Sequence, residues 1–144
     1  MAATPNRNDR SKTVLVVEDE ATIRYILRIV LGRMGYFVLE GSNGADGLNV
    51  SQTFNGRIDL VISDVRMPKM DGPEMVRHIQ AERPGIKILL ISAYSTESVP
   101  PDLSKDFLAK PFLPAAIEKK VQEMLAGDPV SLGRRNWHQP KYWA

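Results

Sequence analysis

Short apolar runs rich in β-branched residues alternate along this chain with segments of helical period, and this alternation constrains the fold more than any other feature. Each run has the length of a strand, and the runs are TVLVV (13–17), YFVLE (36–40), IDLVIS (58–63), IKILLIS (86–92) and DFLAK (106–110). Parallel strands need helix-length connections, so strands that alternate with helices predict an α/β fold with a doubly wound parallel sheet of five strands.

Segments with apolar residues at three- and four-residue steps separate these runs and predict helices at 20–34, 44–54, 71–82 and 114–126. Pro73 and Pro114 fit the first turns of the last two helices, because proline is tolerated there. The helix at 44–54 has the weakest pattern, and we expect Ala45, Leu48 and Phe54 to face inward.

Length and composition indicate one ordinary globular domain. The chain has 144 residues, of which 43% are apolar and 25% charged. No apolar run approaches the roughly 20 residues that span a bilayer, and the polar start MAATPNRNDRSK has no signal core. The sequence contains no cysteine, which excludes disulfides and thiolate metal sites. We therefore expect a cytoplasmic protein that does not bind membranes.

The positive charge of the chain lies in its two ends. The formal net charge is +2, but residues 1–12 and residues 127–144 each carry +2, which leaves −2 on residues 13–126. The charge therefore predicts no dedicated nucleic-acid-binding face. We expect a disordered arm at 1–12, one domain at 13–126 and a tail at 127–144.

Polar residues follow the predicted strands at the points where the strands end. The first strand is followed by Glu18 and Asp19, the third by Asp64, the fourth ends at Ser92 and the fifth at Lys110. Ligands of doubly wound sheets bind at the carboxyl ends of the strands, so these side chains should meet at one edge. Three crowded carboxylates favour a cation between them, and an all-oxygen set favours Mg²⁺. With a lysine and a hydroxyl beside them, the carboxylates have the parts for phosphoryl transfer.

At these strand ends the sequence resembles the receiver domain of two-component response regulators. The motifs are ED (18–19), DVRMPKMDG (64–72), SA (92–93) and KPF (110–112), and the resemblance covers about residues 12–126. It implies a flavodoxin-like sheet of order 2-1-3-4-5 and a phosphorylation-dependent signalling switch with no effector domain in the chain. Such a domain is not a classical enzyme, although it catalyses its own phosphorylation and slow dephosphorylation.

The resemblance also implies a role for each motif residue. Asp64 would accept a phosphoryl group from a histidine kinase or a histidine phosphotransfer protein. Mg²⁺ would be held by Glu18, Asp19, Asp64 and the backbone carbonyl of Arg66, while Lys110 and Ser92 would contact the phosphoryl group.

Further positions follow from the same resemblance. Ser92 and Phe107 would form the switch, Arg66 and Tyr94 would modulate the site, and Pro111 would follow a cis peptide bond. A structural interpretation stays open for some of these residues. Glu18 and Asp19 suit a helix N-terminus, Ser92 a strand-end cap, and Phe107 a core position.

The segment between Ser92 and Phe107 departs from the family pattern. It holds only 14 residues, and Pro100-Pro101 interrupts it. Since proline disfavours helical geometry, we expect a fourth helix that is shortened to about one turn or irregular. Val99, Leu103 and Tyr94 are then expected to dock only when the domain is phosphorylated. The usual dimerisation surface is in doubt, which suggests a monomer or weak dimer.

Other classes of protein remain as alternatives. The chain could be a receiver domain excised from a hybrid histidine kinase. A haloacid-dehalogenase-type phosphatase also uses a strand-end aspartate, but it would need an acid where Arg66 stands. A dinucleotide-binding enzyme would need a glycine-rich fingerprint after the first strand, and none is present. The sequence does not name the downstream partner protein.

Overall fold

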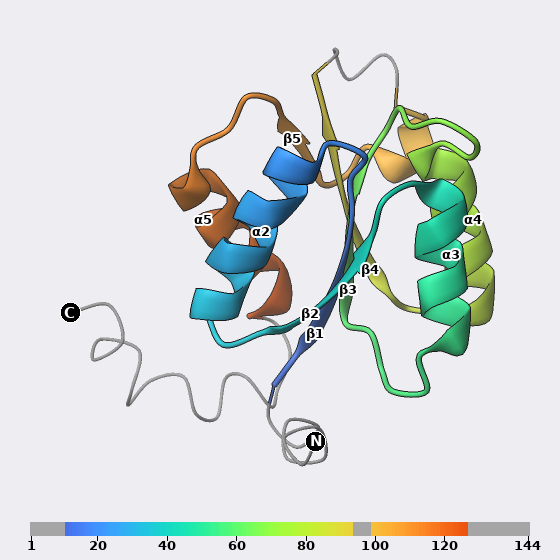
Figure 1. The fold of residues 1–144 in the computed structure, drawn as a ribbon, viewed down its shortest axis with the longest axis horizontal. Coiled ribbons are helices and arrows are strands. Elements are labelled where there is room, and N and C mark those ends of the chain that lie inside the picture. Colours follow the sequence, from blue (N-terminus) through green and yellow to red (C-terminus); the bar gives the residue numbers. More distant parts are fainter. Residues whose placement is uncertain (1–10, 94–98, 127–144) are drawn as a thin grey trace.

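Five parallel strands form the centre of the fold in the computed structural model, which describes residues 11–93 and 99–126 (Figure 1). The strands are β1 (Thr13–Val17), β2 (Phe37–Gly41), β3 (Leu60–Asp64), β4 (Lys87–Ser92) and β5 (Phe107–Ala109). Their order in the sheet is β2-β1-β3-β4-β5, and each neighbouring pair is parallel. The predicted fold class and strand order are confirmed.

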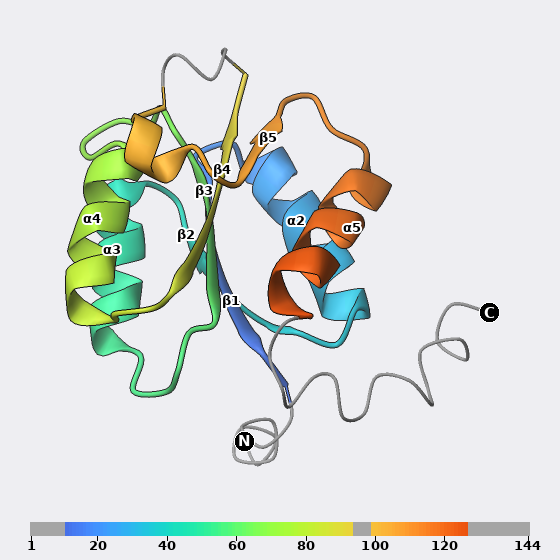
Figure 2. The same ribbon diagram turned by 180° about the vertical axis from the view of Figure 1, so that it is seen from behind.

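In the described part of the chain, four α-helices cover the two faces of the sheet. One face carries α2 (Ala21–Arg33) and α5 (Pro114–Leu125), and the other carries α3 (Gly44–Thr53) and α4 (Gly72–Glu82), as the two opposite views show (Figures 1 and 2). Among the described residues, no helix is long and apolar enough to cross a bilayer.

The strand period of two divides the buried residues between two cores. In β1, Val14 and Val16 pack under α2 and α5 with Leu27 and Ile117. The alternate residues of β1, Leu15 and Val17, point to the opposite face of the sheet. There they belong to a second cluster that includes Met75 and Ile79 of α4. Burial on both faces fixes the register of β1 and β3, and therefore fixes which residues stand at the carboxyl edge.

The inward face of α3 differs from the prediction. Ala45 is exposed, whereas Gly44, Gly47 and Ser51 are buried. Leu48 and Phe54 are half-buried and pack against the second core, as expected. The helix lies close to β1 at Gly47, where an added Cβ would lie 2.7 Å from Val17 Cγ2.

The connection from β4 to β5 contains one short regular element among its described residues, the 3₁₀ turn η2 (Pro101–Leu103). Tyr94 and residues 95–98 lie outside the described part of the chain. Val99 and Leu103 are only 4% and 6% exposed and pack in the second core, to which Phe107 also packs. The prediction that these two residues are undocked without phosphorylation is wrong. Residues 1–10 and 127–144, which make up the predicted tail and most of the predicted arm, also lie outside the described residues.

Candidate functional site

Two strand ends bring the central carboxylates of the candidate site together. Glu18 follows β1 directly, and Asp64 is the last residue of β3. Because β1 and β3 are paired neighbours, with Val17 opposite Ser63, the two side chains emerge side by side. One carboxylate oxygen from each of Glu18, Asp19 and Asp64 lies within 4.8 Å of the others. Glu18 and Asp64 are buried, while Asp19 is exposed and forms the solvent side of the cluster.

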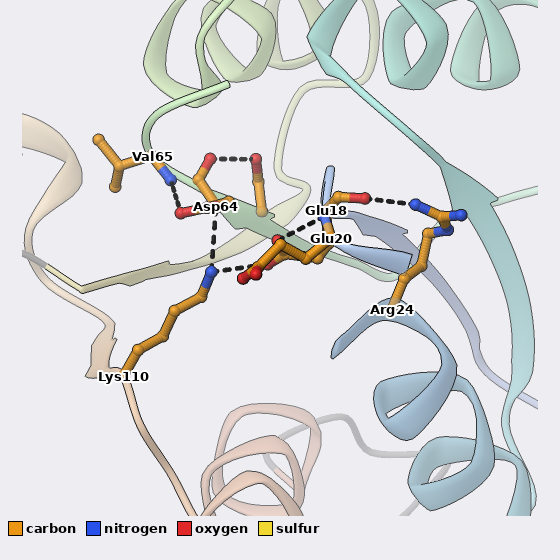
Figure 3. A network of polar contacts seen from close by, with 7 residues as sticks. Glu18, Glu20, Arg24, Asp64, Val65 and Lys110 are labelled. Carbon is orange, nitrogen blue, oxygen red and sulfur yellow. Dashed lines mark hydrogen bonds and ion pairs between the residues drawn. The ribbon is translucent and has the colours of Figure 1, made fainter. Parts of the chain in front are cut away.

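Lys110 supplies a positive charge to this cluster from the far end of β5. Its Nζ lies 3.0 Å from Asp64 Oδ2 and 3.0 Å from Glu18 Oε1 (Figure 3). The backbone N–H of Lys110 donates to the carbonyl of Ser92 at 2.8 Å, which joins the lysine to the end of β4. Burial lowers the pKa of Lys110, but the ion pairs with Glu18 and Asp64 outweigh it and hold the pKa above its usual value.

Glu18 is the most deeply buried acid of the cluster. Its side chain is fully buried, and its Oε2 accepts a hydrogen bond from the backbone N–H of Glu20 at 3.1 Å. Oε1 contacts the Lys110 ammonium but accepts no well-aligned hydrogen bond from any described residue. Burial, assisted by the charge of Asp64, raises the pKa of Glu18 to about 7 despite the neighbouring lysine. The site therefore holds a buried carboxylate that its own neighbours do not fully satisfy.

Asp64 is held by its strand and by the loop that follows. Its Oδ1 accepts from the backbone N–H of Val65 at 2.8 Å, and its Oδ2 accepts from Lys110 Nζ at 3.0 Å. Its carbonyl oxygen accepts from Ser63 Oγ at 2.8 Å. Every part of Asp64 is therefore fixed by a neighbour, and its carboxylate faces Lys110 and Glu18 at the sheet edge.

These residues fit a hard divalent cation. The cluster's ligand atoms are all carboxylate oxygens, and the buried Glu18 Oε1 meets the Lys110 ammonium at 3.0 Å without a well-aligned hydrogen bond. Neither a thiolate nor an imidazole belongs to the cluster. The acidic pocket predicted from the strand ends is thus present, with Lys110 as its neighbouring cation.

The remaining predicted site residues differ in how near they stand to this pocket. Ser92 is buried at the end of β4, and its carbonyl oxygen accepts a hydrogen bond from the backbone N–H of Lys110. The Lys110–Pro111 peptide bond is cis. Arg66 is exposed on the loop after Asp64. Phe107 is half-buried and packs against the second core, so its core interpretation describes the position it occupies in this structure.

Two supporting residues were missed by the sequence analysis. Ser63 is buried within an apolar strand, and its hydroxyl donates a hydrogen bond to the Asp64 carbonyl. A polar residue inside an otherwise apolar strand was the sequence signal that could have identified it. Arg24 Nη1 donates to the Glu18 carbonyl at 2.7 Å from the first turns of α2, and no motif marked it. The DG at 71–72 begins α4, where Asp71 Oδ1 accepts from the Glu74 N–H at 2.9 Å.

The fold and this pocket define a doubly wound α/β domain with an acidic site at the carboxyl edge of its sheet, and comparison with known proteins gives its family. The model of the response regulator receiver domain matches residues 14–122. The chain belongs to the response regulator receiver domain family of two-component systems. This membership sets aside the haloacid dehalogenase and dinucleotide-binding alternatives.

Individual relatives support the same assignment. The sensor kinase CckA of Brucella abortus is 38% identical over 80% of this chain, which covers 13% of that kinase. The alkaline phosphatase synthesis transcriptional regulatory protein PhoP of Bacillus subtilis is 32% identical over 80% of this chain and 49% of its own length. The structure of chemotaxis response regulator CheY4 of Vibrio cholerae has a TM-score of 0.72 and 30% identity, and the match covers 80% of this chain and 99% of that chain. The chain thus spans half or less of the length of these two curated relatives, and the match spans nearly all of the CheY4 chain.

Proposed function

We propose that Asp64 accepts a phosphoryl group in the presence of Mg²⁺ and that the phosphorylated domain presents a changed surface to its partners. The observation that carries this proposal is the buried cluster of Glu18 and Asp64, with Lys110 Nζ 3.0 Å from each and Asp19 within reach on the solvent side. Membership of the receiver family supports the same reaction.

The chemistry follows from the charges of the pocket. A carboxylate oxygen of Asp64 attacks the phosphorus of a phosphohistidine, a P–O bond forms, and the P–N bond breaks with its electron pair leaving on the imidazole nitrogen. Lys110 neutralises negative charge next to the acceptor, because its ammonium already lies at hydrogen-bond distance from Asp64. Glu18, Asp19, Asp64 and the Arg66 carbonyl would hold Mg²⁺, which supplies further positive charge to the phosphoryl oxygens.

Two further roles are part of the proposal. Ser92, at the end of β4, contacts the phosphoryl group through its hydroxyl, and Phe107 then changes its packing as the switch aromatic. Arg66 and Tyr94 would modulate access to the aspartyl phosphate. The phosphodonor is a histidine kinase or a histidine phosphotransfer protein, and the protein that reads the signal is unassigned.

The receiver domain could function as a stand-alone protein or as one domain of a hybrid histidine kinase. Its relatives include a sensor kinase and transcriptional regulators, so both a stand-alone switch and a receiver within a hybrid kinase fit the comparisons. An immunoblot for the native protein distinguishes them, since a hybrid kinase would migrate far above the 16.1 kDa of this chain.

Incubation with acetyl phosphate and Mg²⁺ tests the acceptor directly. The wild-type protein should gain one hydroxylamine-sensitive phosphoryl group, and Asp64→Asn should gain none. Asp102→Asn is a matched control, because Asp102 is an exposed aspartate that pairs with Arg77 on another part of the fold. Equal labelling of Asp64→Asn and the wild type would disprove the assignment.

A further inference from the structure

The loop at 65–71, between β3 and α4, carries the Arg66 carbonyl that the proposed metal site needs, and its ends are held by backbone contacts. The N–H of Gly72 donates to the carbonyl of Val65 at 2.8 Å, which closes the loop. A Cβ on Gly72 would clash with the carbonyl oxygen of Asp64 and lie 2.9 Å from Ser63 Oγ. At Gly72 the backbone of the loop therefore lies closer to β3 than it could if residue 72 carried a side chain.

A second glycine, which belongs to α3 and not to the loop, lies against the loop backbone. Gly44 is the first residue of α3, and a Cβ built on it would clash with the carbonyl oxygen of Met70, the residue just before the Asp71 cap of α4. It would also lie 2.8 Å from the carbonyl carbon of Met70 and 2.9 Å from its Cβ. The start of α3 is thus in direct contact with the backbone of the loop.

An added side chain at Gly44 should displace the loop, because α3 has little freedom to move. Further along α3, a Cβ on Gly47 would lie 2.7 Å from both Val17 Cγ2 and Met75 Sδ, so the helix is already in close contact with β1 and α4. The first turn of α3 is capped by Asn43, whose Oδ1 accepts from the Asp46 N–H at 2.8 Å. By contrast, residues 66, 68 and 69 of the loop are exposed.

We propose that Gly44 is a positioning residue for the metal site: it lets α3 support the backbone of the 65–71 loop so that the Arg66 carbonyl stays aligned with Asp64. The inference rests on the proposed function, because it assigns a role in Mg²⁺ binding. Residues that orient metal ligands without touching the metal typically change metal affinity by roughly 10- to 100-fold when altered. Gly44→Ala should therefore weaken Mg²⁺ binding at least about tenfold.

The experiment is a Mg²⁺ titration of ¹⁵N-labelled protein, following the backbone amides of residues 65–72, together with urea unfolding of each variant in EDTA. Gly32→Ala is the matched control, since Gly32 is also helical but a Cβ on it would meet no atom within 4 Å. Asn43→Ala is a second, milder variant that removes the cap of α3 and leaves Gly44 unchanged. Amide shifts report the loop and the metal separately from phosphorylation activity.

The expected result is a higher Mg²⁺ midpoint in Gly44→Ala, with altered amide shifts at 65–72 even without metal, and an unchanged midpoint in Gly32→Ala. Asn43→Ala should shift the midpoint in the same direction by a smaller factor, and this variant decides the matter if Gly44→Ala does not fold. A lower stability with an unchanged Mg²⁺ midpoint in the folded variants would overturn the inference and leave the proposed function standing. A wild-type protein that binds no Mg²⁺ would overturn both.

Discussion

Replacing Glu18 by glutamine should stabilise the metal-free protein, because this variant keeps the shape of the buried side chain and removes its charge. Burial raises the pKa of Glu18 from 4.5 to about 7, so the folded protein holds this proton more tightly than the unfolded chain. The contribution of Glu18 to stability is therefore greatest below about pH 4.5 and is lost as the pH rises to about 7.

The size of the effect follows from the same pKa. At about 1.4 kcal/mol for each pKa unit, the shift from 4.5 to about 7 corresponds to roughly 3 kcal/mol of destabilisation by the ionised carboxylate at pH 8. At roughly 4 °C per kcal/mol for a domain of this size, Glu18→Gln should melt roughly 10 °C above the wild type at pH 8.

Urea unfolding in EDTA at pH 8 and at pH 4 measures the prediction. The gain in unfolding free energy should be present at pH 8 and absent at pH 4, where the wild-type carboxyl is protonated. Glu20→Gln is the control, because Glu20 lies two residues away and is exposed. Added Mg²⁺ should stabilise only the wild type and so narrow the gap, by about 1.4 kcal/mol at ten times the dissociation constant. If Glu18→Gln is no more stable at pH 8, or if its gain does not depend on pH, the account of Glu18 is wrong.

Four further predictions test other parts of the molecule. Asp64→Asn should fold, melt no lower than the wild type without metal, and resist phosphorylation by the cognate kinase; a labelled variant would contradict the acceptor assignment. Millimolar Mg²⁺ should raise the melting temperature of the wild type and raise that of Asp19→Asn less, and equal responses would remove Asp19 from the metal site. Burial raises the pKa of Tyr36 to about 12, so stability should fall between about pH 10 and 12 and fall less in Tyr36→Phe. Beryllofluoride with Mg²⁺ should change hydrogen exchange at residues 99–103, and unchanged exchange there would place the output on another face.

The sequence predicted the strands and the carboxyl-edge pocket because both depend on local patterns and on one topological rule. A continuous, β-branched apolar run of strand length fits a strand in a sheet with helices on both faces, and parallel strands place all their carboxyl ends together. Glu18 and Asp64 therefore met as expected, since each stands at the end of such a run. Lys110 was placed by the same rule, and it reaches both acids from β5.

The prediction for α3 went wrong because a hydrophobic pattern reports which side chains are apolar and not how closely a backbone can approach. Ala45 was expected inside, yet the buried positions are Gly44, Gly47 and Ser51. The contact between Gly44 and the Met70 carbonyl joins residues far apart in the sequence, and no local signal specifies it. Such contacts could be found only after the sheet order had placed α3 beside the 65–71 loop.

The fourth helix, between β4 and β5, was predicted to be shortened to about one turn or irregular, but the packing of this connection was not foreseen. A segment with two adjacent prolines cannot continue a long helix, so the single turn in its described residues followed from backbone geometry. Val99 and Leu103 were expected to dock only on phosphorylation, but a few apolar residues are enough to hold a loop when each fills a space in an existing core. Leu103 does so at the end of η2, where it is almost fully buried. The bidentate ion pair of Arg77 with Asp102, at 2.8 and 3.1 Å, adds a surface contact to α4.

The packing of the β4–β5 connection determines how a structural change at the acidic pocket would reach the surface of the domain. Phe107 shares a core cluster with Val99 and Leu103, and that cluster continues into α4 through Val76 and Ile79. A well-packed core does not deform gradually, so a changed position of Phe107 would require the neighbouring residues of the β4–β5 connection to repack. A receiver with a long fourth helix can pass such a change to that helix as a rigid body. Here the described part of the connection offers only the single turn η2, which is buried at Leu103 and paired to α4 at Asp102. The signal would therefore appear first on the surface formed by η2 and the adjoining turns of α4.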